Sequence, residues 1–313
     1  MSIHAPLVPD AEPLLLGVDG GGTRSRARLA DLSGATVAEA VGGPANIRFG
    51  LEESLAVVFE LGARCLDAAG LLPQDSQRVV ACLALAGASE PAHCAAAARY
   101  PHPYRDAVVT TDARAACVGA HRGRDGGIVI VGTGSIGWAE LRGRQVRVGG
   151  WGLAVSDEGS GAWLGREALR RVLWAHDGRI QWTGLLTILF GRFQSDPHAI
   201  VRFSADARPR DFGELAPVIV ERAAAADPVA VQLMGAAGSH VDALARGLIA
   251  HGTRRVALMG GLARAIEPWL AEDTRRHLVA PQGDAVDGAL LIAAAAAGLT
   301  PADMRLRTLE KHR

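Results

Sequence analysis

Lysine is almost absent from this sequence: the only one among the 313 residues is Lys311. A nucleotide-binding P-loop needs a lysine within the pattern GxxxxGKS/T, and because that pattern does not occur, a P-loop mechanism is excluded. The remaining positive charge comes from scattered arginines, and the formal net charge is zero. We therefore expect no basic surface for nucleic acid or for an anionic membrane, and the partner should be a small molecule.

Paired cysteines and long apolar segments are also missing. The four cysteines contain no CxxC pair and are Cys65, Cys82, Cys94 and Cys117. This pattern favours free thiols in a reducing cytoplasm. The apolar run at 289–297 is too short to cross a bilayer, and residues 1–13 lack the basic and then apolar order of a signal peptide. We therefore expect a cytoplasmic protein without a membrane segment.

Glycine, by contrast, is plentiful, and the segment LLLGVDGGGTR at 14–24 places three glycines after an apolar strand. Glycines let the backbone bring its N–H groups close to anionic oxygens, and the Thr23 hydroxyl can donate one more hydrogen bond. A carboxylate beside a polyphosphate would be repelled unless a cation lay between them. Asp19 is therefore expected to organise Mg²⁺ and its water shell. The alternative is an ordinary glycine-rich hairpin turn.

Strand and helix patterns alternate through the first part of the chain. The elements expected there are strands at 26–30, 36–41, 78–87 and 106–112, and helices at 51–69, 90–99 and 113–121. Such alternation indicates an α/β sheet covered on both faces, in which sites form at the carboxyl ends of the strands. Asp19 and Asp112 both occupy such ends.

The opening pattern recurs at 126–138, where an apolar strand again leads into a glycine turn with hydroxyls, which suggests two duplicated lobes. Residues 132–137 also match GxGxxG, but we expect a hairpin after them and not a helix, so the context of a nicotinamide or flavin site is missing. A third apolar strand, at 254–261, ends in Gly260 and Gly261. Three such turns together favour phosphoryl transfer, which depends mainly on positioning and charge neutralisation.

The second part of the chain is expected to be mostly helical. Helices are expected at 162–175, 181–193, 196–203, 212–226, 229–251, 265–271 and 287–297, with a short strand at 276–279. The loop at 149–161, before the first of these helices, carries Asp157 and Glu158 among several glycines. Asp157 either belongs to a site or, like Ser160, simply caps the helix.

Seven short motifs follow one another along the chain in an order that is typical of one family. They are VDGGGTR at 18–24, GPAN at 43–46, TDA at 111–113, GTGS at 132–135, GGWG at 149–152, DEGS at 157–160 and MGGL at 259–262. In this order they resemble the BadF/BadG/BcrA/BcrD ATPase family and, within it, the N-acetylglucosamine and glucosamine kinases. The resemblance spans about residues 14 to 297 and places the chain in the sugar kinase, Hsp70 and actin superfamily. It implies two RNase H-like α/β lobes, at 12–121 and 122–313, with a cleft between them.

The resemblance also implies roles for individual residues. The two phosphate loops would be Gly20, Gly21, Gly22 and Thr23, and Gly132, Thr133, Gly134 and Ser135, while Gly260 and Gly261 would lie against the adenosine. The sugar would be held by Asn46, Gly150, Trp151, Gly152 and Asp157. Asp112 would be the catalytic carboxylate at the sugar's 6-hydroxyl. The alternatives are a helix cap for Asp112, a turn residue for Asn46 and a place in the core for Trp151.

The implied activity is phosphorylation of an amino sugar at its 6-hydroxyl by ATP and Mg²⁺, with N-acetylglucosamine slightly ahead of glucosamine. Trp151 would suit a neutral acetamide, whereas Glu158 would suit an ammonium group. The other hypothesis is an ATP-dependent activator protein that is not a sugar kinase. The cysteine arrangement of iron–sulfur activators is not visible in this sequence, which argues against it. We also expect a homodimer.

Overall fold

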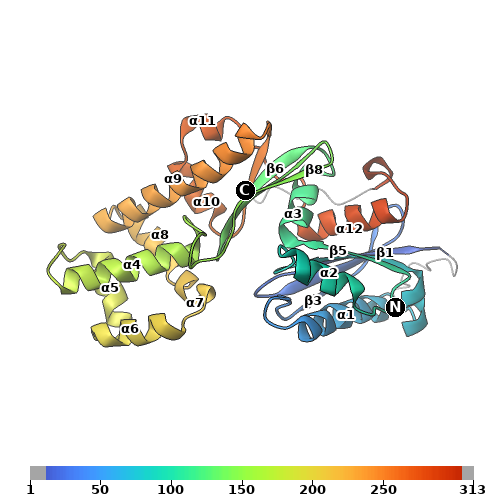
Figure 1. Ribbon diagram of the computed structural model, residues 1–313, viewed down its shortest axis with the longest axis horizontal. Helices are drawn as coiled ribbons and strands as arrows, with labels where there is room; N and C mark the ends of the chain where they lie inside the picture. The colour runs from blue at the N-terminus through green and yellow to red at the C-terminus, as the bar shows by residue number, and fades with distance from the viewer. Residues whose placement is uncertain (1–11, 305–313) are drawn as a thin grey trace, which may run out of the picture. The chain divides into compact units, whose positions relative to one another are not determined.

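A computed structural model describes residues 12–304 of the chain, which form two compact units (Figure 1). The first unit combines residues 12–125 with 281–304, and the second unit is Gly126–Ala280. Each unit is built around one β-sheet, so the predicted α/β class with two lobes is confirmed. These units differ from the predicted lobes in two respects: the first boundary follows Asp125 and not residue 121, and the segment from Pro281 packs with the first unit and not with the second.

The first sheet has five strands in the order β3-β2-β1-β4-β5. They are β1 (Leu14–Gly20), β2 (Ser25–Ala30), β3 (Thr36–Gly42), β4 (Val79–Leu85) and β5 (Asp106–Thr111). Strands β1, β2 and β3 pair antiparallel in chain order, while β4 and β5 run parallel to β1. The carboxyl ends of β1, β4 and β5 therefore lie at the same edge of this sheet.

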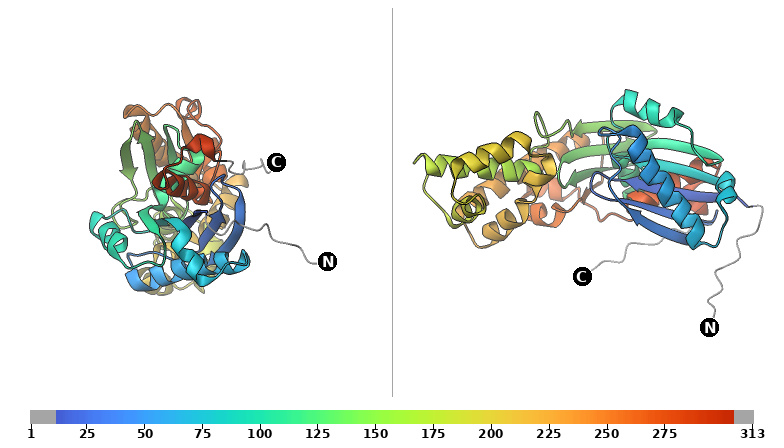
Figure 2. Two further views of the ribbon diagram at one scale, coloured as in Figure 1. Left: turned by 90° about the vertical axis from the view of Figure 1, so that its right-hand side faces the viewer. Right: turned by 90° about the horizontal axis from the view of Figure 1, so that it is seen from below.

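Helices cover both faces of the first sheet, as Figures 1 and 2 show. They are α1 (Leu51–Ala68), η1 (Pro73–Arg78), α2 (Pro91–Arg99), α3 (Asp112–His121), α12 (Ala285–Ala296) and η3 (Pro301–Asp303). On β1, Leu14 and Leu16 pack into the core under α1, whereas Leu15 packs into the core under α12. A strand that is buried on both faces reads as an unbroken apolar run, which explains the opening leucines.

The second sheet repeats this hairpin topology with four strands in the order β8-β7-β6-β9. They are β6 (Gly126–Val131), β7 (Ser135–Leu141), β8 (Arg144–Gly149) and β9 (Val256–Met259). Strands β6, β7 and β8 are antiparallel, and β9 runs parallel to β6. The predicted duplication is thus visible in the pairing of the strands, since β6 corresponds to β1 and β9 to β4.

The helices of the second unit differ in places from the sequence expectation. They are α4 (Gly161–His176), α5 (Gly184–Arg192), α6 (Pro197–Asp206), α7 (Pro209–Gly213), α8 (Ala216–Ala224), α9 (Pro228–Ala250), α10 (Ala263–Ile266), η2 (Glu267–Trp269) and α11 (Glu272–Arg275). The single helix predicted at 212–226 is wrong, because α7 ends at Gly213 and a new helix, α8, begins at Ala216 with Pro217 in its first turn. Pro268 likewise divides the helix predicted at 265–271. The strand predicted at 276–279 is only an isolated bridge between Leu278 and Val256.

Helix α12 is the element that returns the chain to the first unit. It contacts β1, β4 and α3, and this cover explains why it is apolar on nearly all sides. The approach to α3 is close because glycines face each other across it: a Cβ on Gly288 would collide with the carbonyl oxygen of Ala115, and one on Gly119 with that of Asp284. The helix begins with a capping box in which Asp284 is the N-cap.

None of the helices within residues 12–304 is long and apolar enough to cross a membrane. Residues 289–296 of the apolar run form the end of α12, which packs inside the first unit.

We predict that Gly288→Ala lowers the free energy of unfolding by about 1–3 kcal/mol, because the added methyl group overpacks the contact between α12 and α3. Chemical denaturation of the whole chain measures this. The control is Gly191→Ala in α5, where a Cβ would meet nothing within 4 Å. That variant should be neutral or gain up to about 1 kcal/mol. Equal stability of the two variants would contradict the close approach.

Candidate active site

The first glycine turn connects β1 to β2 at the carboxyl edge of the first sheet. Gly22 and Thr23 are exposed there, so their N–H groups and the Thr23 hydroxyl are accessible to a ligand. The turn is tied to its neighbours by two backbone hydrogen bonds: Ala45 N donates to Gly21 O at 2.9 Å, and Ala86 N donates to Gly20 O at 2.7 Å. A loop held this firmly can present N–H groups to a phosphate without rearranging.

Asp19 is the second-last residue of β1, directly before Gly20 and the turn. The guanidinium of Arg26, its cross-strand neighbour on β2, donates from Nη2 to Oδ2 of Asp19 at 3.0 Å. Burial raises the pKa of Asp19, and the pairing with Arg26 opposes that rise in part. The carboxylate therefore needs positive charge nearby to be stable as an anion.

The surroundings of Asp19 fit Mg²⁺ only together with a nucleotide. Within residues 12–304 no group of three or more His, Cys, Asp or Glu side chains could hold a metal ion. Mg²⁺ is usually bound by one or two carboxylates, several waters and the phosphates of a substrate, and not by a cage of protein ligands. A single carboxylate beside an exposed glycine turn matches that kind of site.

Asn46 lies next to the same turn. Its Oδ1 accepts a hydrogen bond from Arg48 N at 3.1 Å, so the predicted turn role is present. Its Nδ2 points to the glycine turn, since a Cβ placed on Gly22 would lie 3.9 Å from it. Asn46 therefore stabilises its loop with one end of the amide and can donate to a ligand with the other.

Asp112 is the first residue of α3, at the carboxyl end of β5. The predicted alternative for it was a helix cap, but the N-cap is Thr111, whose hydroxyl accepts from Arg114 N at 3.0 Å. Asp112 accepts from Ala113 N at 2.8 Å and is partly exposed. Asp19, Asn46 and Asp112 are thus brought to one edge of the first sheet, at the ends of β1, β4 and β5.

In the second unit, the turn at Gly132, Thr133, Gly134 and Ser135 connects β6 to β7. The start of α4 closes over it, because Gly161 N donates to Gly132 O at 2.8 Å. The loop before α4 is joined to the turn as well, since Ser135 Oγ donates to Glu158 O at 2.8 Å. The third predicted glycine turn is adjacent: Leu262 N, which follows Gly260 and Gly261, donates to Val131 O at 3.0 Å.

Asp157 lies between this turn and the predicted sugar segment. Its Oδ1 accepts from Gly152 N at 3.3 Å, and a Cβ on Gly134 would lie 2.9 Å from its Oδ2. Its backbone has φ +61°, which is left-handed and unusual for a residue other than glycine. Burial raises the pKa of Asp157, and the N–H group of Gly152 opposes the rise. The helix itself is capped by Ser160, so Asp157 is not its cap.

Trp151 is not a core residue, because 64% of its surface is exposed. The guanidinium of Arg147, on β8, lies over its ring at 3.8 Å from the centroid. Arg147 also donates to the carbonyl oxygens of Gly149 and Gly150, so the arginine fixes both the loop and the indole. An exposed aromatic ring that is stacked on one face by a cation suits a ligand on the other face.

Sequence reasoning did not identify three charged residues that shape these sites. They are Arg26, Arg147 and Asp284. Arg26 lies on β2, the first strand after its glycine turn, and Arg147 lies on β8, the second strand after its turn. Because arginine is seldom buried without a partner, an arginine in a half-buried strand could have indicated a charged site. Asp284 could not be identified in this way, because its partner Arg26 is 258 positions away.

Comparison with known proteins agrees with the arrangement of these turns. The model of the BadF/BadG/BcrA/BcrD ATPase family matches residues 16–293. The chain is 38% identical over 278 residues to glucosamine kinase GspK of Vibrio cholerae, and the match covers 89% of this chain and 95% of that protein. It is 32% identical over 182 residues to the N-acetylmuramic acid/N-acetylglucosamine kinase of Clostridium acetobutylicum, which covers 56% of this chain and 58% of that protein.

Solved structures share the fold. A candidate N-acetylglucosamine kinase from Chromobacterium violaceum has a TM-score of 0.84 at 36% identity, and the match covers 90% of this chain and 99% of that chain. A ROK family glucokinase from Streptomyces griseus, solved with glucose and AMPPNP, has a TM-score of 0.51 at 19% identity and covers 91% of this chain and 98% of that chain. The second likeness concerns the fold alone.

Proposed function

We propose that this chain, which belongs to the BadF/BadG/BcrA/BcrD ATPase family, transfers the γ-phosphoryl group of ATP to the 6-hydroxyl of an amino sugar. The observation that carries the proposal is the edge of the first sheet, where Asp19, Asn46 and Asp112 accompany an exposed glycine turn. Phosphate binding, charge neutralisation and activation of a hydroxyl each have a candidate group at this edge.

In the first unit, the N–H groups of Gly20, Gly21, Gly22 and Thr23 would hold phosphate oxygens. Asp19 would hold Mg²⁺ through its water shell, and that ion would offset the negative charge of the phosphates when bound. Asp112 would accept the proton of the sugar's 6-hydroxyl or orient that hydroxyl for in-line attack, which a weakly nucleophilic alcohol requires. Asn46 would donate a hydrogen bond to the sugar.

In the second unit, Gly132, Thr133, Gly134 and Ser135 would form the other phosphate loop, with Gly260 and Gly261 against the adenosine. Asp157 would accept hydrogen bonds from sugar hydroxyls, since an ionised carboxylate only accepts. Gly150, Trp151 and Gly152 would meet the substituent at the sugar's 2-position. The homodimer and the cytoplasmic location stay predictions from the sequence.

N-acetylglucosamine is the acceptor that we favour. The Arg147 guanidinium is permanently charged and lies on Trp151, so it disfavours a second cation at the 2-position and leaves an uncharged acetamide acceptable. Glucosamine is the second candidate, because the Vibrio cholerae relative is named a glucosamine kinase. Glu158, which is exposed beside Asp157, supplies a carboxylate for its ammonium group.

The decisive test is ADP release from Mg-ATP with N-acetylglucosamine, glucosamine, N-acetylmannosamine and glucose in parallel. We expect saturable turnover with an amino sugar, highest with N-acetylglucosamine, and nuclear magnetic resonance of the product should place the phosphate on O6. Highest turnover with glucosamine would select the second candidate. Slow ADP release that no sugar stimulates would contradict a kinase and favour the activator hypothesis.

Replacing Asp112 by Asn should lower kcat at least about a hundredfold, because the amide cannot accept the hydroxyl proton, while binding of Mg-ATP stays close to normal. The matched control is Asp106→Asn, because Asp106 begins β5 whereas Asp112 directly follows the other end of that strand. That variant should retain full turnover. Full activity of Asp112→Asn would remove the catalytic role from this carboxylate.

Replacing Arg147 by Gln should raise kcat/KM for glucosamine relative to N-acetylglucosamine by about fivefold, the effect of removing about 1 kcal/mol of repulsion near the surface. Arg144→Gln is the control, because Arg144 lies on the same strand but donates to His251 O at 3.4 Å. An unchanged preference in Arg147→Gln would show that the 2-substituent does not lie near this arginine.

A further inference from the structure

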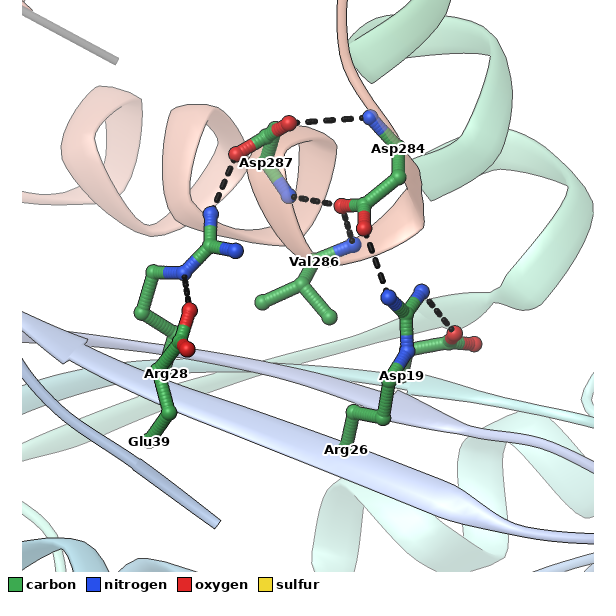
Figure 3. A network of polar contacts seen from close by, with 7 residues as sticks. All are labelled: Asp19, Arg26, Arg28, Glu39, Asp284, Val286 and Asp287. Atoms are coloured by element: carbon green, nitrogen blue, oxygen red, sulfur yellow. Dashed lines mark hydrogen bonds and ion pairs between the residues drawn. The ribbon is translucent and has the colours of Figure 1, made fainter. Parts of the chain in front are cut away.

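Two arginines on β2 join the first sheet to the start of α12, as Figure 3 shows. Arg26 donates from Nη1 to Oδ2 of Asp284 at 2.6 Å, and Arg28 donates from Nη1 to Oδ1 of Asp287. The two residues are separated by one position on the strand, so their side chains project to the same face. Both pairs therefore perform the same structural task of anchoring α12.

The remaining contacts of the two arginines differ. Arg26 turns its second nitrogen, Nη2, to Oδ2 of Asp19 at 3.0 Å. Arg28 instead donates from Nε to Oε1 of Glu39 at 2.5 Å, on the neighbouring strand β3. Arg26 is thus the one member of this pair of arginines that reaches the carboxylate beside the glycine turn.

Asp284 is itself held in one orientation. Its Oδ1 accepts from Val286 N and Asp287 N, both at 3.0 Å, because it is the N-cap of α12. Its other oxygen, Oδ2, is the one that binds Arg26. A carboxylate fixed by a helix start is a rigid support, so the planar guanidinium between Asp284 and Asp19 has little freedom to turn.

We propose that Arg26 is a positioning residue that orients Asp19 for the metal-bound nucleotide, and that Asp284 at the start of α12 is its anchor. Arg26 engages only one oxygen of Asp19, and the other, Oδ1, is left to face a metal-bound water. This inference rests on the proposed function, because it takes Mg-ATP as the ligand of the first glycine turn. It extends that site to a residue 265 positions beyond Asp19 in sequence, since Asp284 follows the whole second unit.

The test is ATP binding to the purified full chain, measured by titration calorimetry over a series of Mg²⁺ concentrations. Arg26→Met should raise the Mg²⁺ concentration for half-maximal binding about tenfold, as loss of a partner that orients a metal ligand does elsewhere. Asp284→Asn, which keeps a good N-cap but loses the charge that holds Arg26, should shift it in the same direction by a smaller factor. Arg26→Lys should fall between wild type and Arg26→Met.

Arg28→Met is the matched control, because it breaks the other pair between β2 and α12 and leaves Asp19 untouched. It should lower the thermal midpoint about as much as Arg26→Met and leave the Mg²⁺ dependence unchanged. Equal Mg²⁺ dependence in the two methionine variants would reduce Arg26 to an anchor of α12 and overturn the proposal. A lower Mg²⁺ requirement in Arg26→Met would also overturn it, since Arg26 would then compete with the metal.

The result also separates this inference from the proposed function. If the wild-type chain binds Mg-ATP and Arg26→Met needs more Mg²⁺ as expected, but the wild-type chain phosphorylates no amino sugar, the positioning role stands and the kinase proposal fails. If the wild-type chain turns over an amino sugar and Arg26→Met keeps the normal Mg²⁺ dependence, the kinase proposal stands and the positioning role fails. Absence of any Mg-ATP binding to the wild-type chain would overturn both.

Discussion

The close packing of α12 against the first sheet and α3 is the constraint on which the first unit depends. Glycines make it possible, because a side chain at Gly288 would collide with the backbone of α3 and one at Gly17 would lie 2.8 Å from Val286 O. The same approach brings the N-cap of α12 over strands β1 and β2. Asp284, at the start of α12, therefore supplies the carboxylate that holds Arg26. The close packing of α12 is thus also what places this charge beside the first sheet.

The carboxylates of Asp19 and Asp284 depend on the positive charge of Arg26 between them. Burial alone raises the pKa of Asp19, and the nearby Asp284 raises it further, so the two carboxylates would repel each other without Arg26 between them. Burial also acts to raise the pKa of Asp284, but the N–H group of Asp287 and the Arg26 guanidinium outweigh it and lower that pKa. The Arg26 guanidinium lowers the pKa of both carboxyl groups and so favours the ionised form of each, which is the form that binds Mg²⁺.

The strands, turns and helix starts could be predicted from the sequence, whereas the features that depend on contacts between distant residues could not. The glycine turns after β1 and β6 and the position of Asp112 at the end of β5 follow from short patterns, because strands, turns and helix starts are local in sequence. The contact between Arg26 and Asp284 has no such pattern, and the place of α12 in the first unit depends on which sheet it packs against. The break within the helix predicted at 212–226 could have been predicted from Pro217, because proline lacks an N–H group and is favoured in the first turn of a helix.

In the second unit a carboxylate, that of Asp157, is also held in position, but by an unusual backbone conformation and not by an arginine. Asp157 has a left-handed backbone, which costs a residue with a side chain about 1 kcal/mol and persists only where the surroundings determine it. Those surroundings are the N–H group of Gly152 on one side and the Gly134 turn on the other. The hydrogen bond from Ser135 to the carbonyl of Glu158 fixes the next residue as well. The carboxylate therefore contacts both the glycine turn and the segment at Trp151, and its position within this unit depends on both of them.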